Sequence, residues 1–256
     1  MLPTLEVVCF IGGTMYDDSL LKKGLEELDL DCSDLQLKQL HQYYEMMVEV
    51  NRVMNLTAIT EYSEVCVKHW LDSLCLVKAV SEGELAKPLN VVDVGTGAGF
   101  PGVPLKIFFP QWKITLMDSL GKRVRFLEQV VSELELTDVN CVHGRAEELG
   151  RQVNYREQYD LCVSRAVTRM ASLTELCLPL VAVGGAMVAY KSAESDEEIT
   201  EAGKAILAMG GTIERQEKFL VPCSEYGRNL VVVRKKTQTS AKYPRGGGKP
   251  MKQPLM

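Results

Sequence analysis

The stretch VVDVGTGAGFPGVPL, residues 91–105, constrains the fold of this chain more than any other feature. A run of branched apolar residues reaches an acid, passes into glycines spaced two apart, and continues into two prolines. This order is typical of a buried strand, a tight turn and the start of a helix, which is how α/β proteins hold nucleotide-like cofactors. The open question is which cofactor this turn would hold.

Two cofactor fingerprints fit the same turn. The dinucleotide fingerprint G-x-G-x-x-G is matched by Gly97, Gly99 and Gly102. The methyltransferase fingerprint, an acid followed by x-G-x-G-x-G, is matched by Asp93 with Gly95, Gly97 and Gly99. In the second case the glycines let the backbone pass close to the methionine and ribose portions of S-adenosylmethionine.

The prolines beside the turn favour S-adenosylmethionine. A dinucleotide's pyrophosphate needs N–H groups from the first helical turn, and Pro101 and Pro104 have none to donate. S-adenosylmethionine has no phosphate, and we expect Asp93 at the strand tip to suit its positive charge. Asp118, which ends the next strand, is expected to accept ribose hydroxyls. It would do the same for NAD, so it does not discriminate.

Strand-like and helix-like segments alternate from residue 90 onward, which predicts a mainly parallel sheet covered on both faces. The strands are expected at 90–95, 113–118, 139–144, 159–166, 185–191, 211–221 and 229–236, and the helices at 102–109, 121–135, 145–151, 170–181 and 194–209. The last two strands are too close in sequence for a helical crossover, which predicts an antiparallel hairpin at one edge. The expected fold is therefore a class I, Rossmann-like methyltransferase with a seven-stranded sheet.

The pattern divides the chain into three parts. Residues 17–85 predict a helical N-terminal lobe, with Ser33 capping its first long helix and a second helix over 61–80. Residues 86–236 form the predicted S-adenosylmethionine-binding domain. Residues 237–256 form a basic, Gly/Pro-rich tail, which we expect to be mobile or to order only on a partner, outside the cofactor motifs.

Charge is distributed unevenly along the chain. The net charge is -5, yet no Asp or Glu follows Arg228 while eight Lys and Arg residues lie from there to the end. A basic end on an acidic body is compatible with a nucleic-acid partner.

Neither metal binding nor membrane insertion is indicated by the composition. The eight cysteines form no C-x-x-C pair, which favours reduced thiols over a metal or disulfide framework. No apolar run approaches the length of a membrane span, and the N-terminus lacks a basic leader region. These features predict a cytoplasmic protein without metal.

A series of motifs points to one family. VGTGAGFPGVPL, LMDSLGKRVRFLEQV, GRAEEL and YDLCVSRAVTRMASLTEL follow in order, with NLTAIT and HWLDSL upstream and YPRGGGKPMKQPL downstream. Together they resemble the RsmG (GidB) family of bacterial small-subunit rRNA guanine-N7 methyltransferases, over about residues 50–256. One departure is Gly246 after Arg245, where many members have a second arginine.

The resemblance implies cofactor contacts at Gly95, Phe100, Ala146, Glu147 and Arg165. Phe100 is expected to form an apolar wall, and the Ala-Glu pair to lie at the adenine edge. Arg165 is expected beside the transferable methyl group. It is the nearest candidate for a catalytic residue, with a positioning role rather than that of a base.

The resemblance also implies 16S rRNA, or the small ribosomal subunit, as the partner. Candidate RNA contacts are Lys122, Arg123 and Arg125, with Lys242 and Arg245 in the tail, although a solvated face is the ordinary role of such a run. A monomer is expected.

The chain lacks two devices of other nucleic-acid methyltransferases. It has no N-P-P-Y or D-P-P-Y stretch for an exocyclic amine, and its Pro222–Cys223 pair follows the sixth strand, where a pyrimidine-attacking cysteine is not expected. Guanine N7 needs neither, because its in-plane lone pair requires mainly positioning. The alternatives are a methyltransferase for another RNA, a protein or a small molecule, and a nucleotide-binding regulatory protein without chemistry.

Overall fold

A seven-stranded sheet of order β3-β2-β1-β4-β5-β7-β6 is the central element of the computed structural model, which describes residues 16–256. Its strands are β1 (Asn90–Val94), β2 (Lys113–Asp118), β3 (Val139–His143), β4 (Tyr159–Arg165), β5 (Val181–Ser192), β6 (Gly211–Leu220) and β7 (Gly227–Lys235). The first five run parallel, and β7 is antiparallel to both β5 and β6. The predicted seven-stranded sheet with an edge hairpin is confirmed. β5 begins at Val181, earlier than the expected residue 185.

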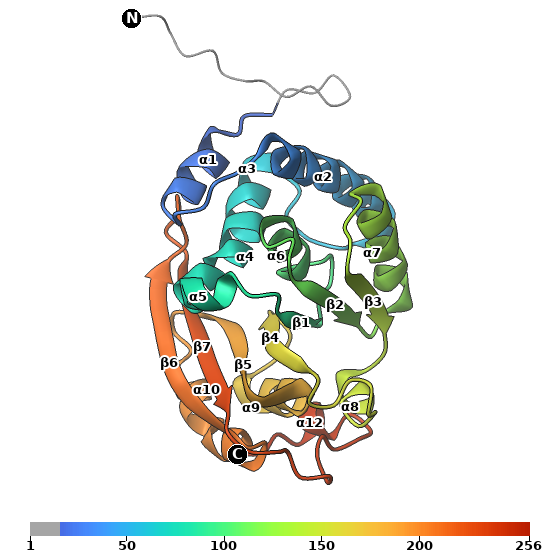
Figure 1. Cartoon of the computed structure of the whole chain (residues 1–256), viewed down its shortest axis with the longest axis vertical. Helices are drawn as coiled ribbons and strands as arrows, with labels where there is room; N and C mark the ends of the chain where they lie inside the picture. The colour runs from blue at the N-terminus through green and yellow to red at the C-terminus, as the bar shows by residue number, and fades with distance from the viewer. Residues whose placement is uncertain (1–15) are drawn as a thin grey trace, which may run out of the picture.

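Side chains of each inner strand alternate between two hydrophobic cores. In β4, Leu161 and Val163 face one core while Cys162 faces the other. The first core lies under α1 (Ser19–Glu26), α2 (Asp34–Met54), α3 (Tyr62–Val65), α4 (Asp72–Leu74), α5 (Glu82–Leu85), α6 (Gly102–Phe108) and α7 (Gly121–Glu133). The second lies under α8 (Ala146–Leu149), α9 (Met170–Cys177), α10 (Asp196–Glu201) and α11 (Gly203–Ala208), and α12 (Lys249–Lys252) packs against α9. Figure 1 shows α2, α6 and α7 on one side of the sheet and α9, α10 and α12 on the other.

The N-terminal helices share their core with the sheet. Buried side chains such as Leu40 and Trp70 belong to the same cluster as Val91 of β1 and Phe126 of α7. The domain boundary at residue 85 stays a prediction. Tyr43 of α2 donates to the Ala98 carbonyl of the glycine turn, and Asp72 of α4 binds Arg165 at the end of β4, so α2 and α4 lie beside the strand tips.

The first long helix begins as predicted. Ser33 accepts a hydrogen bond from the Gln36 backbone N–H, and the Gln36 side chain accepts one from the Ser33 N–H at 2.8 Å. This reciprocal pair is a capping box.

The second expected helix, 61–80, is confirmed as one continuous helical run over residues 62–78, although its turns are not all α-helical. A π-helical stretch, Cys66–Leu71, separates α3 from α4, and a 3₁₀ turn, Cys75–Lys78, follows. The Ser73 hydroxyl donates to the His69 carbonyl, and Arg165 donates to the carbonyls of Lys68 and His69. These side-chain donors compete with the α-helical ladder, which explains the widened turn.

The prediction that residues 237–256 are mobile or ordered only on a partner is wrong. Arg156 donates to the Tyr243 carbonyl at 2.8 Å and to the Thr239 carbonyl at 2.6 Å. Arg151 donates to the Pro244 carbonyl at 2.8 Å. Composition suggested disorder because the tail carries little apolar surface, but arginines of the body satisfy its backbone carbonyls instead.

No helix within residues 16–256 is long and apolar enough to cross a membrane. The predicted absence of a leader concerns the first residues of the chain, which lie outside the described range, as does Cys9. The other seven cysteines are free thiols, four of them buried.

Candidate cofactor site

The glycine turn after β1 requires glycine for two different reasons. Gly95 has φ +71°, and a Cβ there would lie 2.5 Å from a methyl carbon of Val167, so the two loops touch. Gly97 has φ +63°, and a Cβ there would meet no atom within 4 Å. The turn is therefore closely packed at Gly95 and open at Gly97.

Asp93 has a different role from the one expected. Its side chain is fully buried (0% exposed), and Oδ2 accepts hydrogen bonds from the Gly102 N–H at 2.8 Å and the Thr96 hydroxyl at 2.7 Å. The carboxylate thus lies at the N-terminus of α6 rather than facing a ligand at the strand tip. An acid at a helix N-terminus is favoured by the helix dipole.

The start of α6 offers no cradle for a phosphate. The N–H of Gly102 is taken by Asp93, that of Val103 donates to the Gly99 carbonyl at 2.7 Å, and that of Leu105 donates to the Pro101 carbonyl. Pro104 has no N–H. The dinucleotide fingerprint is matched in sequence, but the amides that would bind a pyrophosphate already have acceptors.

Burial raises the pKa of the Asp93 carboxyl from 3.8 to about 6, because hydrogen bonds from Thr96 and Gly102 offset only part of the lost hydration. Its Oδ1 has no partner among the described residues. The group is thus more easily protonated in the folded than in the unfolded protein.

We expect Asp93→Asn to become increasingly more stable than the wild type as pH rises from 4 to 6. Well below pH 3.8 the wild-type carboxyl is protonated in both states, and above pH 6 the folded protein must bury its charge. A pKa raised from 3.8 to about 6 corresponds to roughly 3 kcal/mol of unfolding free energy. Urea unfolding across this pH range measures the difference. A difference that does not change with pH would contradict this assignment.

A cavity of about 240 Å³ lies at the carboxyl ends of β1, β2 and β3 and brings together four of the predicted cofactor residues: Gly95, Asp118, Ala146 and Glu147. Its other lining residues are Val94, Met117, Ser119, Gly144, Arg145, Val167, Leu176 and Met251. The apolar members form a hydrophobic wall, and the two carboxylates supply hydrogen-bond acceptors. This is the composition of a site for a ligand with an apolar ring and hydroxyl donors.

Asp118 ends β2 with its carboxylate at the turn. Its Oδ2 accepts from the Gly97 N–H at 3.0 Å and its Oδ1 from the Leu120 N–H at 2.9 Å, with Arg123 at 3.5 Å. A carboxylate has about four acceptor positions, so capacity remains for ligand hydroxyls. Gly97 therefore positions Asp118 but does not itself line the cavity.

Ala146 and Glu147 begin α8, immediately after β3. Glu147 is buried and lies 3.5 Å from the guanidinium of the exposed Arg145. The main-chain turn at Gly144 hydrogen-bonds to the Asp118 carbonyl at 3.0 Å, which ties the ends of β2 and β3 together. The two carboxylates are thereby held on neighbouring strand tips.

Phe100 and Arg165 do not line this cavity. The Phe100 ring stacks on His69 with centroids 4.3 Å apart, and the Arg165 guanidinium lies 5.2 Å from its centroid. Burial, together with the neighbouring Arg165, lowers the pKa of His69 to about 3, so its ring is neutral. Phe100 and Arg165 therefore join the glycine turn to the N-terminal helices.

Arg165 is fixed by an acid that the sequence did not assign to it. Its Nη1 lies 2.6 Å from Asp72, and Asp72 also accepts from Arg228 at 2.7 and 2.9 Å. This cluster of Asp72, Arg165 and Arg228 links α4 to β4 and β7. The expectation of Arg165 beside a transferable methyl group stays untested, but its guanidinium is already bound to protein acceptors.

Met251 is the lining residue from the C-terminal tail, and the sequence argument missed it. The tail was expected to lie outside the cofactor motifs, and the structure corrects this, because α12 places Met251 in the cavity wall. The signal was present in the segment KPMKQPL, which belongs to the motif series. No periodicity indicated which residue of that segment would turn toward the sheet.

The candidate RNA-contacting residues differ in accessibility. Lys122, Arg125 and Lys242 are exposed, and Arg123 is half-buried beside Asp118. Arg245 forms a two-point ion pair with the buried Glu175, at 2.6 and 2.9 Å. Its guanidinium therefore fastens the tail, and contact with a phosphate would require this pair to break.

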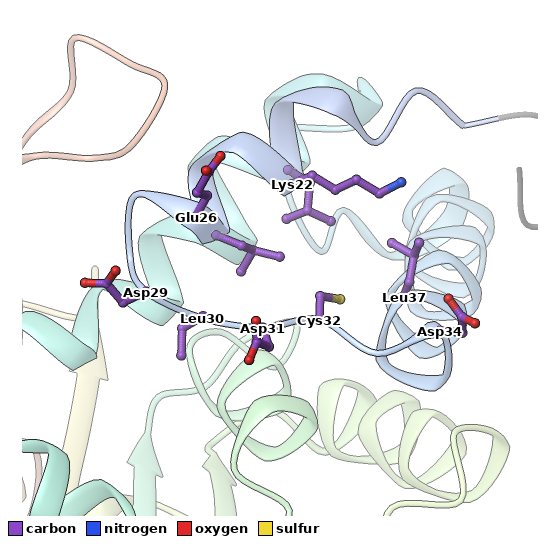
Figure 2. A pocket seen from close by; sticks show the side chains of 10 residues that line it. Lys22, Glu26, Asp29, Leu30, Asp31, Cys32, Asp34 and Leu37 are labelled. Carbon is purple, nitrogen blue, oxygen red and sulfur yellow. The ribbon is translucent and has the colours of Figure 1, made fainter. Parts of the chain in front are cut away.

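A larger hollow, of about 510 Å³, lies between α1 and α2 and is shown in Figure 2. Glu26, Asp29, Asp31 and Asp34 line it with Lys22, and their carboxylates point in different directions. None of the strand-tip motifs reaches it. Within residues 16–256 no group of three or more His, Cys, Asp or Glu side chains is arranged to hold a metal ion.

A family model described as rRNA small subunit methyltransferase G (GidB) matches residues 36–230. The chain belongs to this family. A protein named ribosomal RNA small subunit methyltransferase G from Lachnoclostridium phytofermentans is 47% identical over 244 residues, covering 94% of this chain and 99% of that one. A protein of the same name from Alkaliphilus metalliredigens is also 47% identical, covering 94% of this chain and 100% of its own. The GidB resemblance of the motif series is confirmed.

Solved structures with the same fold are more distant in sequence. A SAM dependent methyltransferase from Aquifex aeolicus has a TM-score of 0.51 at 18% identity, covering 70% of this GidB-family chain and 96% of that one. A putative sarcosine dimethylglycine methyltransferase from Galdieria sulphuraria has a TM-score of 0.52 at 14% identity, with coverage of 70% and 89%. At these identities the likeness shows the fold alone.

Proposed function

We propose that this chain transfers a methyl group from S-adenosylmethionine to N7 of a guanine in 16S rRNA of the small ribosomal subunit. The observation that carries the proposal is the cavity at the strand tips, where Asp118 and Glu147 face an apolar wall. Membership of the GidB family supports the same function. The N-terminus of α6 supports a cofactor without phosphate, because Asp93 already occupies it.

The cavity residues fit S-adenosylmethionine. Asp118 has acceptor capacity for the ribose hydroxyls, and Ala146 with Glu147 would border the adenine. Val94, Met117 and Leu176 supply apolar contact for the ring. Gly97 leaves open space beside the turn for the methionine portion. Asp93, Phe100 and Arg165 do not line the cavity, and we assign them to holding the glycine turn in place.

When bound, the cofactor supplies a methyl carbon to the guanine N7 lone pair, and the electron pair of the broken S–C bond stays on sulfur. The chain's contribution is to hold the cofactor at the strand tips and the base in line with it. No general base is required, because N7 carries no proton to remove. Excluding water and fixing the geometry are the tasks left to the protein.

The exposed Lys122, Arg125 and Lys242 are proposed contacts for RNA phosphates, with Arg123 nearer the cofactor. Their charges are local features of an acidic chain, so RNA affinity would depend on these patches. We further propose that the protein works as a monomer in the cytoplasm. Its proposed parts are an N-terminal lobe at residues 17–85, a catalytic domain at 86–236 and the tail at 237–256.

The test is methyl transfer from tritiated S-adenosylmethionine to small ribosomal subunits from a bacterium that lacks the modification. We expect radioactivity in 16S rRNA. Label in another RNA or a small molecule would favour the alternative substrate class. Cofactor binding with no transfer to any RNA would favour a regulatory protein.

A further inference from the structure

Met251 connects the C-terminal tail with the cofactor cavity. It lies in α12 and is one of the cavity's lining residues, together with Gly95, Asp118 and Glu147. Its side chain is 49% exposed, so part of it borders the cavity and part faces solvent. A methionine thioether is flexible and polarizable, which suits it to contact an adenine ring.

The segment before α12 is bound to α9 and to the residue that follows α8 by two residues, Arg151, and both helices contribute to the cavity wall. Arg245 binds the fully buried Glu175 of α9 through its backbone N–H at 2.7 Å and its guanidinium at 2.6 Å. Arg151, which follows α8, donates to the Pro244 and Lys242 carbonyls. The helix α8 itself carries Ala146 and Glu147 of the cavity.

Three glycines join this fastened segment to α12. Gly247 and Gly248 have φ values of +70° and +72°, and a Cβ at Gly246 or Gly247 would meet no atom within 4 Å. Such a run has backbone freedom and few contacts. The helix itself is docked over the cavity: Arg245 also donates to the Gln253 carbonyl, just after α12, at 2.7 Å, and α12 packs against α9.

The outer side of the same segment is basic. Lys242, Lys249 and Lys252 are exposed, and none forms an ion pair with another residue of the described part of the chain. No acidic residue lies between Arg228 and the end of the chain. An anionic partner would therefore bind here without local repulsion.

We propose that α12 is a wall of the cofactor site, with Met251 as a cofactor contact and Lys249 and Lys252 as RNA contacts, so that cofactor and RNA strengthen each other's binding. This inference rests on the proposed function and deepens it. RNA phosphates on the lysines and the cofactor against Met251 would both favour the docked position of α12, which the three preceding glycines allow to shift. By linkage, bound cofactor favours RNA to the same extent.

Calorimetry with S-adenosylhomocysteine tests the wall. We expect Met251→Ala to weaken binding about five- to tenfold, because roughly half of an apolar side chain contacts the ligand. Met256→Ala is the matched control, since Met256 is 51% exposed in the same tail but does not line the cavity. A chain ending at Gly248 removes α12 entirely and should bind at least as weakly as Met251→Ala.

Repeating the titration with saturating 16S rRNA tests the coupling. We expect RNA to tighten S-adenosylhomocysteine binding at least about fivefold in the wild type. Lys249→Ala combined with Lys252→Ala should abolish the tightening without changing affinity in the absence of RNA. The salt slope of RNA binding should flatten by about 1.4, for two phosphate contacts.

The outcomes separate this inference from the proposed function. Suppose that the wild type binds S-adenosylhomocysteine and methylates rRNA, while Met251→Ala and Met256→Ala bind S-adenosylhomocysteine equally well. The assignment of Met251 as a cofactor contact is then wrong, and the proposed function stands. If RNA leaves the wild-type affinity unchanged, the coupling is wrong. If the wild type binds no S-adenosylhomocysteine, the proposed function itself fails.

Discussion

Gly97→Val is expected to abolish binding of S-adenosylhomocysteine while the protein stays folded. The introduced Cβ would meet no protein atom within 4 Å, so the branched side chain would fill the open space beside the strand tips. A β-branched residue at φ +63° also strains the turn that presents the Gly97 N–H to Asp118. We expect affinity to fall at least a hundredfold, measured by calorimetry.

Gly184→Val provides a matched control for this substitution. Gly184 also has a positive φ, +93°, and open space around its Cβ, but it lies near the opposite ends of the strands, in β5. It should show a similar loss of stability and an unchanged affinity for S-adenosylhomocysteine. Normal binding by Gly97→Val, with circular dichroism showing a folded protein, would place the cofactor elsewhere.

Asp72→Ala is expected to lower the free energy of unfolding by about 3–5 kcal/mol. Asp72 is 1% exposed and accepts hydrogen bonds from two arginines, Arg165 and Arg228. Removing it leaves two guanidinium groups close together without their shared acceptor, which is the costly way to break a buried ion pair. Urea unfolding at neutral pH measures the loss.

Asp196→Ala tests whether burial of the ion pair causes the large loss of unfolding free energy expected for Asp72→Ala. Asp196 is paired with Lys218 at 2.6 Å, but it is 66% exposed, so its loss should cost at most about 1 kcal/mol. Equal small losses in both variants would mean that the Asp72 cluster does not hold α4 against β4 and β7. Asp72→Asn, which keeps an acceptor oxygen, should fall between them.

The sheet was predictable from sequence because its signals are local. Strand-like segments that alternate with helix-like ones marked the strands, and the short link between β6 and β7 required a hairpin. The π-helical stretch within the helix over residues 61–80 was not predictable in this way. It depends on Arg165, about 100 residues later, which binds the carbonyls of Lys68 and His69.

The site was predictable in part for the same reason. Gly95, Asp118, Ala146 and Glu147 follow directly after strands whose carboxyl ends meet, so sequence motifs place them together. The orientation of Asp93 depended on a hydrogen bond to Gly102, and that of Arg165 on Asp72. Met251 depended on how the tail packs on α9. Such contacts between distant segments leave no periodic trace in the sequence.

The most direct test of the central claim is to locate the methyl group on the product of the transfer reaction. Small ribosomal subunits lacking the modification are methylated by the wild-type protein, and the 16S rRNA is digested to nucleosides for mass spectrometry. The account predicts 7-methylguanosine, formed by the wild type and lost in Gly97→Val. Methyl groups on a pyrimidine or an exocyclic amine, or none in 16S rRNA, would contradict it.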